Sequence, residues 1–272
     1  MGNPVIDVCD IEALANHAHK YNIPLIIDNT VPSPYLCRPF EYGADIIIHA
    51  LTKYISGHGN SMGGIVVDSG KFDWTKSGKF PDLTKNDPSY HGISYTETFK
   101  EAAYITRIRT ALLRDLGCCL SPFNSYLTLV GLETLHLRME RHSESALKIA
   151  KWLKNSEYVK WVTYPHLEGS KYYNLSKKYM PKGGSSIVAF GLNWDRKNLE
   201  KFVTELKLFI HATNIGDSRS IITCPSLTTH RQLSDEELKK AGIGIEFVRL
   251  SVGLEDPDDL IADLEQAFKK SV

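Results

Sequence analysis

Residues 45–59 read "DIIIHALTKYISGHG", three consecutive isoleucines that lead into a lysine and a glycine–histidine turn. A short β-branched run of this kind predicts a buried strand. A lysine that ends such a strand loses proton affinity through desolvation, which makes its amine a nucleophile near neutral pH. The alternative is that the Lys53 amine reaches solvent while its aliphatic stem packs on apolar surface.

Two further apolar runs accompany this strand, "IPLIIDN" at 23–29 and "GGIVVD" at 63–68. Unbroken strands between helical segments are typical of a parallel sheet covered on both faces. Functional residues of such sheets gather at the carboxyl ends of the strands. Asp28 and Lys53 both lie at such ends, so we expect them to share one site.

The rest of the chain shows two kinds of secondary-structure pattern, a helix-rich one before residue 160 and alternating short strands and helices after it. Asp10 is expected to cap a helix over 11–21, and helical patterns cover 97–117 and 122–153. Between them, 71–96 lacks periodicity, but its aromatic residues favour an ordered surface loop.

From residue 160 short strands alternate with helices, which predicts a smaller α+β domain. The strands are expected at 160–165, 185–192 and 246–253, and the helices at 198–207, 234–242 and 256–270. We therefore predict a large α/β domain over 1–140 and a small C-terminal domain over 141–272.

Composition narrows the class of protein. The 272 residues carry 32 Lys plus Arg and 32 Asp plus Glu, a zero net charge that gives no sign of a nucleic-acid partner. No apolar run reaches the roughly 20 residues needed to cross a bilayer. The five cysteines are scattered, as expected for reduced thiols in a cytosolic protein. His17 and His19 face apart on a helix, so no metal site is expected.

Several motifs together carry a family resemblance. They are "IPLIIDNTVPSPYLCRP", "GADIIIHALTKYISGHG", "GGIVVDSGKFDW", "SPFNSYLTLVGLETLHLRMERH" and "IEFVRLSVGLEDPDDLIADLEQA". In this order they resemble the pyridoxal-phosphate enzymes of cysteine and methionine metabolism, and span almost the whole chain. The long segment through "SYHGISY" is most similar to the O-acetylhomoserine sulfhydrylase branch.

The resemblance implies a fold-type I pyridoxal-phosphate transferase and gives roles to three residues. Lys53 would form the Schiff base with the cofactor aldehyde, and Asp28 would hold the ring nitrogen in its protonated state. Thr52 would contact the phosphate. Ala50 departs from the family, because a serine hydroxyl commonly contacts the phosphate there.

Two more residues are expected to bind the substrate. Arg249, in the apolar strand "FVRLSVG", needs an anion if it is buried, and a guanidinium matches a carboxylate in bidentate fashion. By resemblance Arg249 binds the substrate α-carboxylate, and Asn214 makes a second contact to it. The alternative for Arg249 is a structural pair with an acid such as Glu255.

The reaction implied by the resemblance is γ-replacement on O-acetylhomoserine by sulfide or a thiol, giving homocysteine or methionine plus acetate. A cystathionine γ-synthase or γ-lyase type of enzyme and a non-catalytic remnant are the alternatives. Small-molecule amino-acid substrates and a homo-oligomer are the expected partners, without nucleic acid or membrane.

Family members are longer at the N-terminus than this sequence. By resemblance the additional segment holds an amide-lined turn for the cofactor phosphate and the residues that reach a neighbouring subunit. We therefore expect the present chain alone to bind pyridoxal phosphate weakly or not at all.

Overall fold

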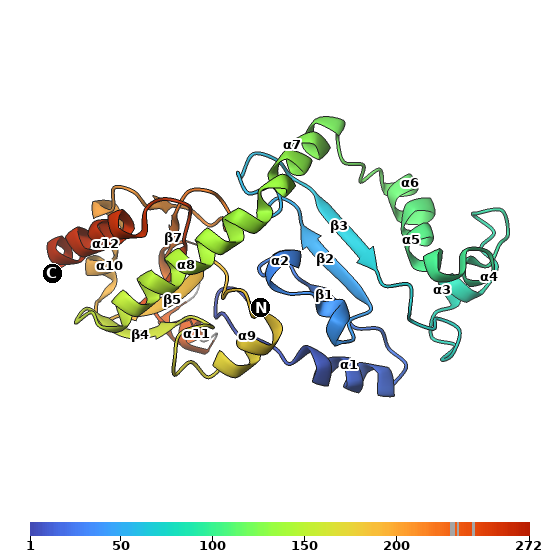
Figure 1. The fold of residues 1–272 in the computed structure, drawn as a ribbon, viewed down its shortest axis with the longest axis horizontal. Helices are drawn as coiled ribbons and strands as arrows, with labels where there is room; N and C mark the ends of the chain where they lie inside the picture. Colours follow the sequence, from blue (N-terminus) through green and yellow to red (C-terminus); the bar gives the residue numbers. More distant parts are fainter. Residues whose placement is uncertain (229–231, 233, 241–242) are drawn as a thin grey trace.

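The computed structural model describes residues 1–228, 232, 234–240 and 243–272. Two sheets lie side by side, and the long helix α8 (Leu135–Lys154) starts near the N-terminal sheet and runs across the C-terminal one (Figure 1). α8 packs against the C-terminal sheet through β4 and β5 and begins beside the turn that carries Lys53. α8, the C-terminal part of the helix expected over 122–153, therefore connects the two sheets.

The N-terminal sheet has three strands in the order β1-β2-β3. β1 (Ile26–Asp28) pairs parallel with β2 (Ile46–Ala50), so both strands end at the same edge, as expected. β3 (Gly64–Asp68) pairs antiparallel with β2, so the prediction of a parallel arrangement was wrong for β3. The loop over 51–63 turns the chain straight back, without the helical crossover that a parallel strand requires.

The faces of this sheet are unequally covered. Ile46 and Ile47 are buried, but Ile26 is 45% and Ile48 37% exposed. The expectation that helices cover both faces is therefore met only in part by the described residues.

Several helical segments pack beside this sheet. α1 (Ile11–Lys20) begins at Asp10, whose carboxylate accepts from the Ala13 N–H at 3.1 Å, as predicted. Short helical segments α2 and η1 lie between β1 and β2 and cover Ser33–Leu36 and Pro39–Tyr42. The helix expected at 97–117 is instead a series of short segments: α4 (Tyr95–Phe99), η2 (Lys100–Ala102), α5 (Ala103–Arg107), η3 (Ile108–Leu113) and α6 (Arg114–Leu116).

The aperiodic segment before these helices is ordered, as its aromatic residues predicted. It contains α3 (Pro81–Thr84), and its rings form a small core with Ile46 and Leu83. Trp74 stacks on Tyr104 with 5.1 Å between ring centroids, and Tyr95 is fully buried. The segment is therefore a packed part of the domain surface.

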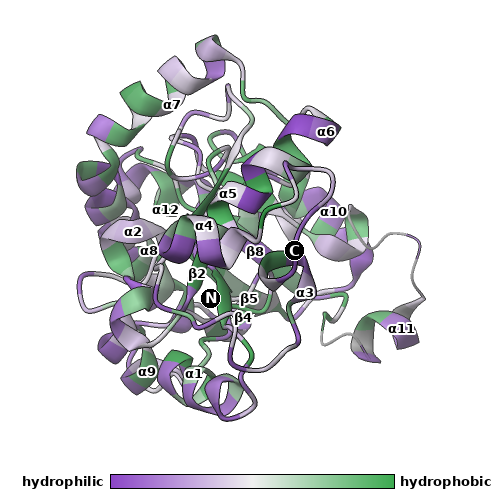
Figure 2. Ribbon diagram, turned by 90° about the vertical axis from the view of Figure 1, so that its right-hand side faces the viewer, coloured by the Kyte–Doolittle hydropathy of each residue, from purple (hydrophilic) through white to green (hydrophobic). Residues whose placement is uncertain are grey.

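The helix expected over 122–153 is two helices. α7 (Pro122–Glu133) ends at Thr134, and α8 begins immediately after it. Figure 2 shows purple and green alternating along α7, and several of its apolar side chains are exposed, among them Phe123, Tyr126 and Leu129.

The C-terminal sheet has five strands in the order β4-β5-β8-β7-β6. β4 (Val159–Thr163), β5 (Ile187–Leu192) and β8 (Phe247–Ser251) are the strands expected from the sequence. β6 (Ile210–His211) and β7 (Ile221–Thr223) were missed, because two or three residues carry no readable alternation.

Helices α10 (Arg196–Glu205) and α12 (Pro257–Ser271) pack on this sheet close to their predicted bounds. α9 (Tyr173–Tyr179) and η4 (Pro225–Leu227) lie in its connections. α11 (Asp235–Lys240) matches part of the helix expected at 234–242, of which 241–242 lie outside the described residues.

The main core lies between this sheet and helices α8, α10 and α12, with Phe190, Phe202 and Phe268 fully buried. A second core joins the two parts of the chain: it contains Leu51 and Tyr54 near the Lys53 turn together with Ile187 and Phe247 of the C-terminal sheet. The functional residues described next surround this second core.

Candidate active site

Lys53 lies in a compact turn that follows β2. The Lys53 N–H donates to the Ala50 carbonyl at 3.1 Å, and the Gly57 N–H donates to the Lys53 carbonyl at 2.7 Å. Gly57 has a φ of +77°, a conformation that favours glycine. These bonds end the strand and turn the Lys53 side chain toward the C-terminal part of the chain.

The Lys53 amine is half-buried and has a neutral partner. Its Nζ donates to the Asn214 Oδ1 at 2.5 Å, where Asn214 belongs to the loop between β6 and β7. Burial first, and the Arg249 guanidinium second, lower the pKa of Lys53 from its ordinary value. The Lys53 amine therefore has a protein partner, although its side chain is still partly exposed as the alternative expected.

Arg249 is buried in the middle of the C-terminal sheet, between β5 and β7. Its Nη2 donates to the Thr213 and Asn214 carbonyls at 3.3 and 3.1 Å and to Thr223 Oγ1 at 3.0 Å. Its Nη1 donates to Asn3 Oδ1 at 2.8 Å, while its buried Nε has no acceptor among the described residues.

The alternative pairing of Arg249 with Glu255 is wrong. Glu255 instead accepts from the Ser220 N–H and hydroxyl, both at 2.8 Å. Arg249 therefore retains donor capacity for an anion, in a place where Asn214 connects it to Lys53.

Asp28 ends β1 beside β2, and its Oδ1 accepts from the Thr30 N–H at 2.9 Å. The Asp28 side chain is exposed in this structure. The expectation that the carboxylate is buried, and therefore requires a partner, was wrong. Thr30 in turn bonds the Ala50 N–H at 2.8 Å and fixes the ends of the two strands together. The structure thus brings Asp28 to the expected sheet edge without a direct contact to Lys53.

Thr52 has other partners in this structure. Its hydroxyl accepts from the Gly63 N–H at 3.1 Å and lies 3.3 Å from the Gly63 carbonyl. These bonds close the loop between β2 and β3. The predicted contact of Thr52 with a phosphate stays a prediction.

Sequence reasoning missed Asn3 and Thr223, which both contact the Arg249 guanidinium. Thr223 lies opposite Arg249 in the β7–β8 pairing, and β7 was itself not predicted. Asn3 is 246 residues away from Arg249, so no local pattern connects them. The "NP" pair at residues 3–4 is the signal that could have drawn attention to this segment.

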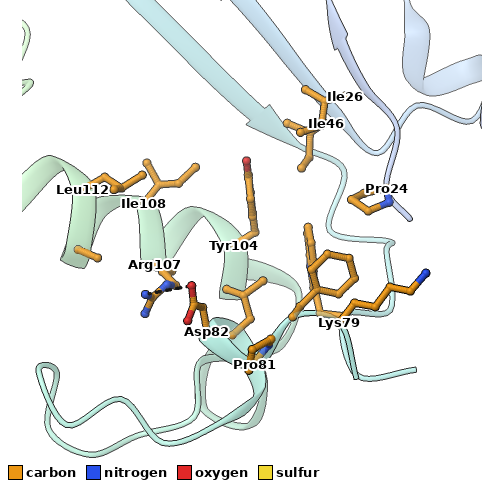
Figure 3. A pocket seen from close by; sticks show the side chains of 14 residues that line it. Pro24, Ile26, Ile46, Lys79, Pro81, Asp82, Tyr104, Arg107, Ile108 and Leu112 are labelled. Atoms are coloured by element: carbon orange, nitrogen blue, oxygen red, sulfur yellow. Dashed lines mark ion pairs between the residues drawn. The ribbon is translucent and has the colours of Figure 1, made fainter. Parts of the chain in front are cut away.

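A cavity of about 470 Å³ lies elsewhere (Figure 3). Ile26 and Ile46 of the N-terminal sheet form one wall, and Tyr104, Ile108 and Leu112 another. None of the five predicted site residues lines it, so it is separate from the Lys53 site.

Comparison with known proteins defines the class. The model of the Cys/Met metabolism PLP-dependent enzyme family matches residues 1–269, and the chain belongs to this family. The fold is that of part of a fold-type I pyridoxal-phosphate enzyme, as the sequence predicted.

Several relatives are similar over nearly the whole chain. The O-acetyl-L-homoserine sulfhydrylase of Leptospira meyeri is 46% identical over 278 residues, which cover 99% of this chain and 63% of that protein. The homocysteine/cysteine synthase of Saccharomyces cerevisiae is 44% identical, again over 99% of this chain and 63% of its own length. The chain thus spans somewhat less than two thirds of the relatives it matches.

Solved structures agree. A putative O-acetylhomoserine (thiol)-lyase of Campylobacter jejuni superposes with a TM-score of 0.92 at 41% identity, over 98% of this chain and 64% of that chain. That structure contains N'-pyridoxyl-lysine-5'-monophosphate. Cystathionine gamma-lyase of Lactobacillus plantarum, complexed with L-serine, superposes with a TM-score of 0.79 at 32% identity, over 98% and 61% of the two chains.

The side chains at the site fit pyridoxal phosphate. A half-buried amine with a lowered pKa suits an aldehyde, and a carboxylate at the end of β1 suits a ring nitrogen. The buried Arg249 Nε, which lacks an acceptor in the described residues, shows that the site has donor capacity to spare for an anion. Among the described helices, none combines the length and the apolar content of a membrane span.

Proposed function

We propose that this chain carries the lysine-bearing part of an enzyme that replaces the γ-acetoxy group of O-acetylhomoserine with sulfide or a thiol. The observation that carries the proposal is the contact of Lys53 with Asn214 beside Arg249, in a chain about 45% identical to sulfhydrylases and homocysteine synthases. The products would be acetate and homocysteine or methionine.

Three residues would hold the cofactor: Lys53 the aldehyde, Asp28 the ring nitrogen and Thr52 the phosphate. When bound, pyridoxal phosphate supplies an aldehyde for amines and a ring that takes up electron density from the substrate Cα. The Asp28 carboxylate would keep a proton on the ring nitrogen. The Thr52 hydroxyl would have to turn from Gly63 to donate to phosphate.

Lys53 would also move protons. A depressed pKa leaves more of the Nζ unprotonated at neutral pH, so that it can take a proton from the substrate Cα and exchange another at Cβ. Asn214 accepts from this Nζ and so orients it. Loss of acetate from Cγ and addition of sulfide or a thiol there complete the exchange.

Arg249 would bind the α-carboxylate of the substrate. Three backbone or hydroxyl oxygens fix its Nη2, and an incoming carboxylate would displace Asn3 from Nη1 and reach the buried Nε, which has no acceptor among the described residues. A planar guanidinium held in this way selects a carboxylate by geometry as well as charge.

Because the chain alone is expected to bind the cofactor weakly, the reaction is tested with a large excess of pyridoxal phosphate, together with O-acetylhomoserine and sulfide. Homocysteine and acetate should appear, and Lys53→Ala should abolish both. Formation of only 2-oxobutyrate and ammonia would favour a γ-lyase. Cofactor binding without any turnover would favour a non-catalytic remnant.

We further propose a homo-oligomer of two-domain subunits, with the domains divided near residue 140 within α8. The exposed apolar side chains of α7 support self-association, because such residues are unfavourable in water when they are grouped. Light scattering of the purified chain tests it, and a monodisperse monomer would contradict it. The cytosolic location is supported by the five unpaired cysteines.

A further inference from the structure

Arg138, near the start of α8, is a buried cation without an acidic partner. It is 5% exposed, and no Asp or Glu of the described chain lies within ion-pair distance of it. Burial of an unpaired guanidinium is costly. Such a residue needs a specific reason to be present.

Its hydrogen bonds point to one segment. Nη1 donates to the Tyr54 carbonyl at 2.7 Å, and Nη2 donates to the Ile55 carbonyl at 3.2 Å. These two carbonyls belong to the turn that carries Lys53. Because the turn ends there, neither carbonyl continues a helix, and Arg138 satisfies both of them as a cap would.

The same guanidinium binds its own helix pair. Nη2 also donates to the Gly131 carbonyl at 2.6 Å, and Nε donates to Thr134 Oγ1 at 3.1 Å. The group therefore ties the break between α7 and α8 to the Lys53 turn.

Two glycines make room for this contact. A Cβ at residue 57 would overlap the Arg138 guanidinium, and a Cβ at residue 131 would overlap the Ser56 carbonyl oxygen. The turn and the helix junction thus approach more closely than residues with side chains would allow.

One helical turn further along, His142 lies on the same side of α8 and contacts the other half of the site. Its Nδ1 lies 2.7 Å from the Val252 carbonyl, directly after β8, the strand of Arg249. A carbonyl only accepts, so Nδ1 carries the proton and donates. The His142 ring also meets the Tyr54 ring edge-on, with 5.8 Å between centroids.

Residues four apart on a helix share a face, so α8 contacts both halves of the site along one edge. We propose that Arg138 and His142 are positioning residues that fix the Lys53 turn and the end of β8 to one face of α8, and so set the separation of the Lys53 amine and the Arg249 guanidinium. This inference rests on the proposed role of Lys53. It adds a helix outside the site as the element that holds the two halves in register.

Competitive acetylation of lysines with trace acetic anhydride tests the proposal without any cofactor. The method reports the pH profile of each amine separately, by mass spectrometry. Besides burial, Arg249 from β8 lowers the pKa of Lys53. Arg138 and His142 of α8 contact the adjacent Tyr54, and the Asp217 carboxylate faces Gly59 of the same loop. If the turn moves away from β8, the Lys53 profile should shift to higher pH.

The informative variants are Arg138→Met and Arg138→Lys. The lysine variant keeps a cation but lacks the planar fork that reaches several carbonyls at once. We expect both to raise the midpoint of Lys53 by roughly half a unit to one unit, with the other lysines unchanged. Arg141→Met is the matched control, because Arg141 lies on the same helix and, within the described part of the chain, contacts the Glu255 carbonyl and Asp256 rather than the Lys53 turn.

Three outcomes are decisive. Folded Arg138 variants with a wild-type Lys53 profile would overturn the proposal. A shift in Arg138→Met alone would also overturn it, because it would assign the effect to charge and not to position. If both variants fail to fold, Thr134→Val removes one acceptor of Arg138 and keeps its charge; a smaller shift supports the proposal and no shift contradicts it.

The outcome is separate from that of the proposed function. A shifted Lys53 profile in a chain that performs no γ-replacement would support the positioning role and contradict the activity. Normal γ-replacement together with an unshifted Lys53 profile would support the activity and contradict the positioning role.

Discussion

The Lys53 amine and the Asn214 side-chain carbonyl are 2.5 Å apart, although 161 residues separate them in the chain. The contact joins the turn after β2 to the loop between β6 and β7. It places a neutral oxygen, and not a carboxylate, on the amine, so nothing at this contact opposes the lowering of the Lys53 pKa by burial and by Arg249.

Asn214→Asp should reverse this effect. A carboxylate at hydrogen-bond distance favours the charged amine, so the pKa of Lys53 should rise by about 1–2 units, moderated by the partial exposure of the pair. Acetylation of Lys53 near pH 8 should slow by roughly tenfold or more. Asn155→Asp, at the exposed end of α8, is the control and should leave Lys53 unaffected. An unchanged Lys53 rate in Asn214→Asp would mean that the contact does not persist in solution.

Arg249→Met should weaken substrate binding more than the chemical step. Loss of a charge-assisted, bidentate contact costs about 3 kcal/mol, so KM for O-acetylhomoserine should rise by roughly 100-fold or more. Arg38→Met, which removes an exposed guanidinium paired with the exposed Glu41, should change KM little. Equal KM values for the two variants would contradict the proposal that Arg249 binds the substrate carboxylate.

His142 should make stability depend on pH. Burial lowers the pKa of His142 from 6.5 to about 4. Between pH 4 and 6.5, His142 is therefore protonated in the unfolded chain and neutral in the folded chain. The stabilisation is complete above pH 6.5 and is lost as the pH falls toward 4, by about 3 kcal/mol in total. Urea unfolding of the wild type at pH 7 and pH 4.5 measures the change.

His142→Asn should flatten this profile, because no imidazole then takes up a proton on unfolding. His17→Gln, a change on the exposed face of α1, should keep the wild-type slope. The same slope in His142→Asn as in the wild type would assign the pH dependence to other groups.

Thiol labelling should divide the cysteines into two groups. Cys9, Cys118 and Cys119 are exposed, whereas burial raises the pKa of Cys37 to about 11 and that of Cys224 to about 12. A thiol reagent at pH 8 should therefore modify the exposed three within minutes, and the buried two only after denaturation. Rapid modification of Cys224 would show that the core between α8, α10 and α12 is open in solution.

The sequence predicted the parts of the site that local patterns reveal. Lys53 and Asp28 each follow an apolar run, and Arg249 interrupts one, so each was visible as a polar residue in an apolar setting. The pairing of Arg249 with Glu255 could be rejected only in three dimensions, where Ser220 proves to be the partner of that carboxylate.

Long-range contacts and short elements could not be predicted in this way. Asn3 has no periodicity that indicates its contact with Arg249, and Arg138 resembles any other cation on an amphipathic helix. β3 has the composition of a parallel strand, but its direction is set by the length of the loop before it. The break between α7 and α8 at Thr134 was not predicted, because the residues on both sides of it favour helix.

Reduction with borohydride in the presence of pyridoxal phosphate is the most direct test of the central claim that Lys53 is the cofactor lysine. The purified chain is incubated with excess cofactor, reduced, digested and mapped by mass spectrometry. The pyridoxyl group should appear on Lys53, at higher occupancy than on any other lysine. The Lys53→Arg variant, treated in the same way, should lose this label without gaining another. A label spread over the surface lysines, or concentrated on a lysine other than Lys53, would contradict the account.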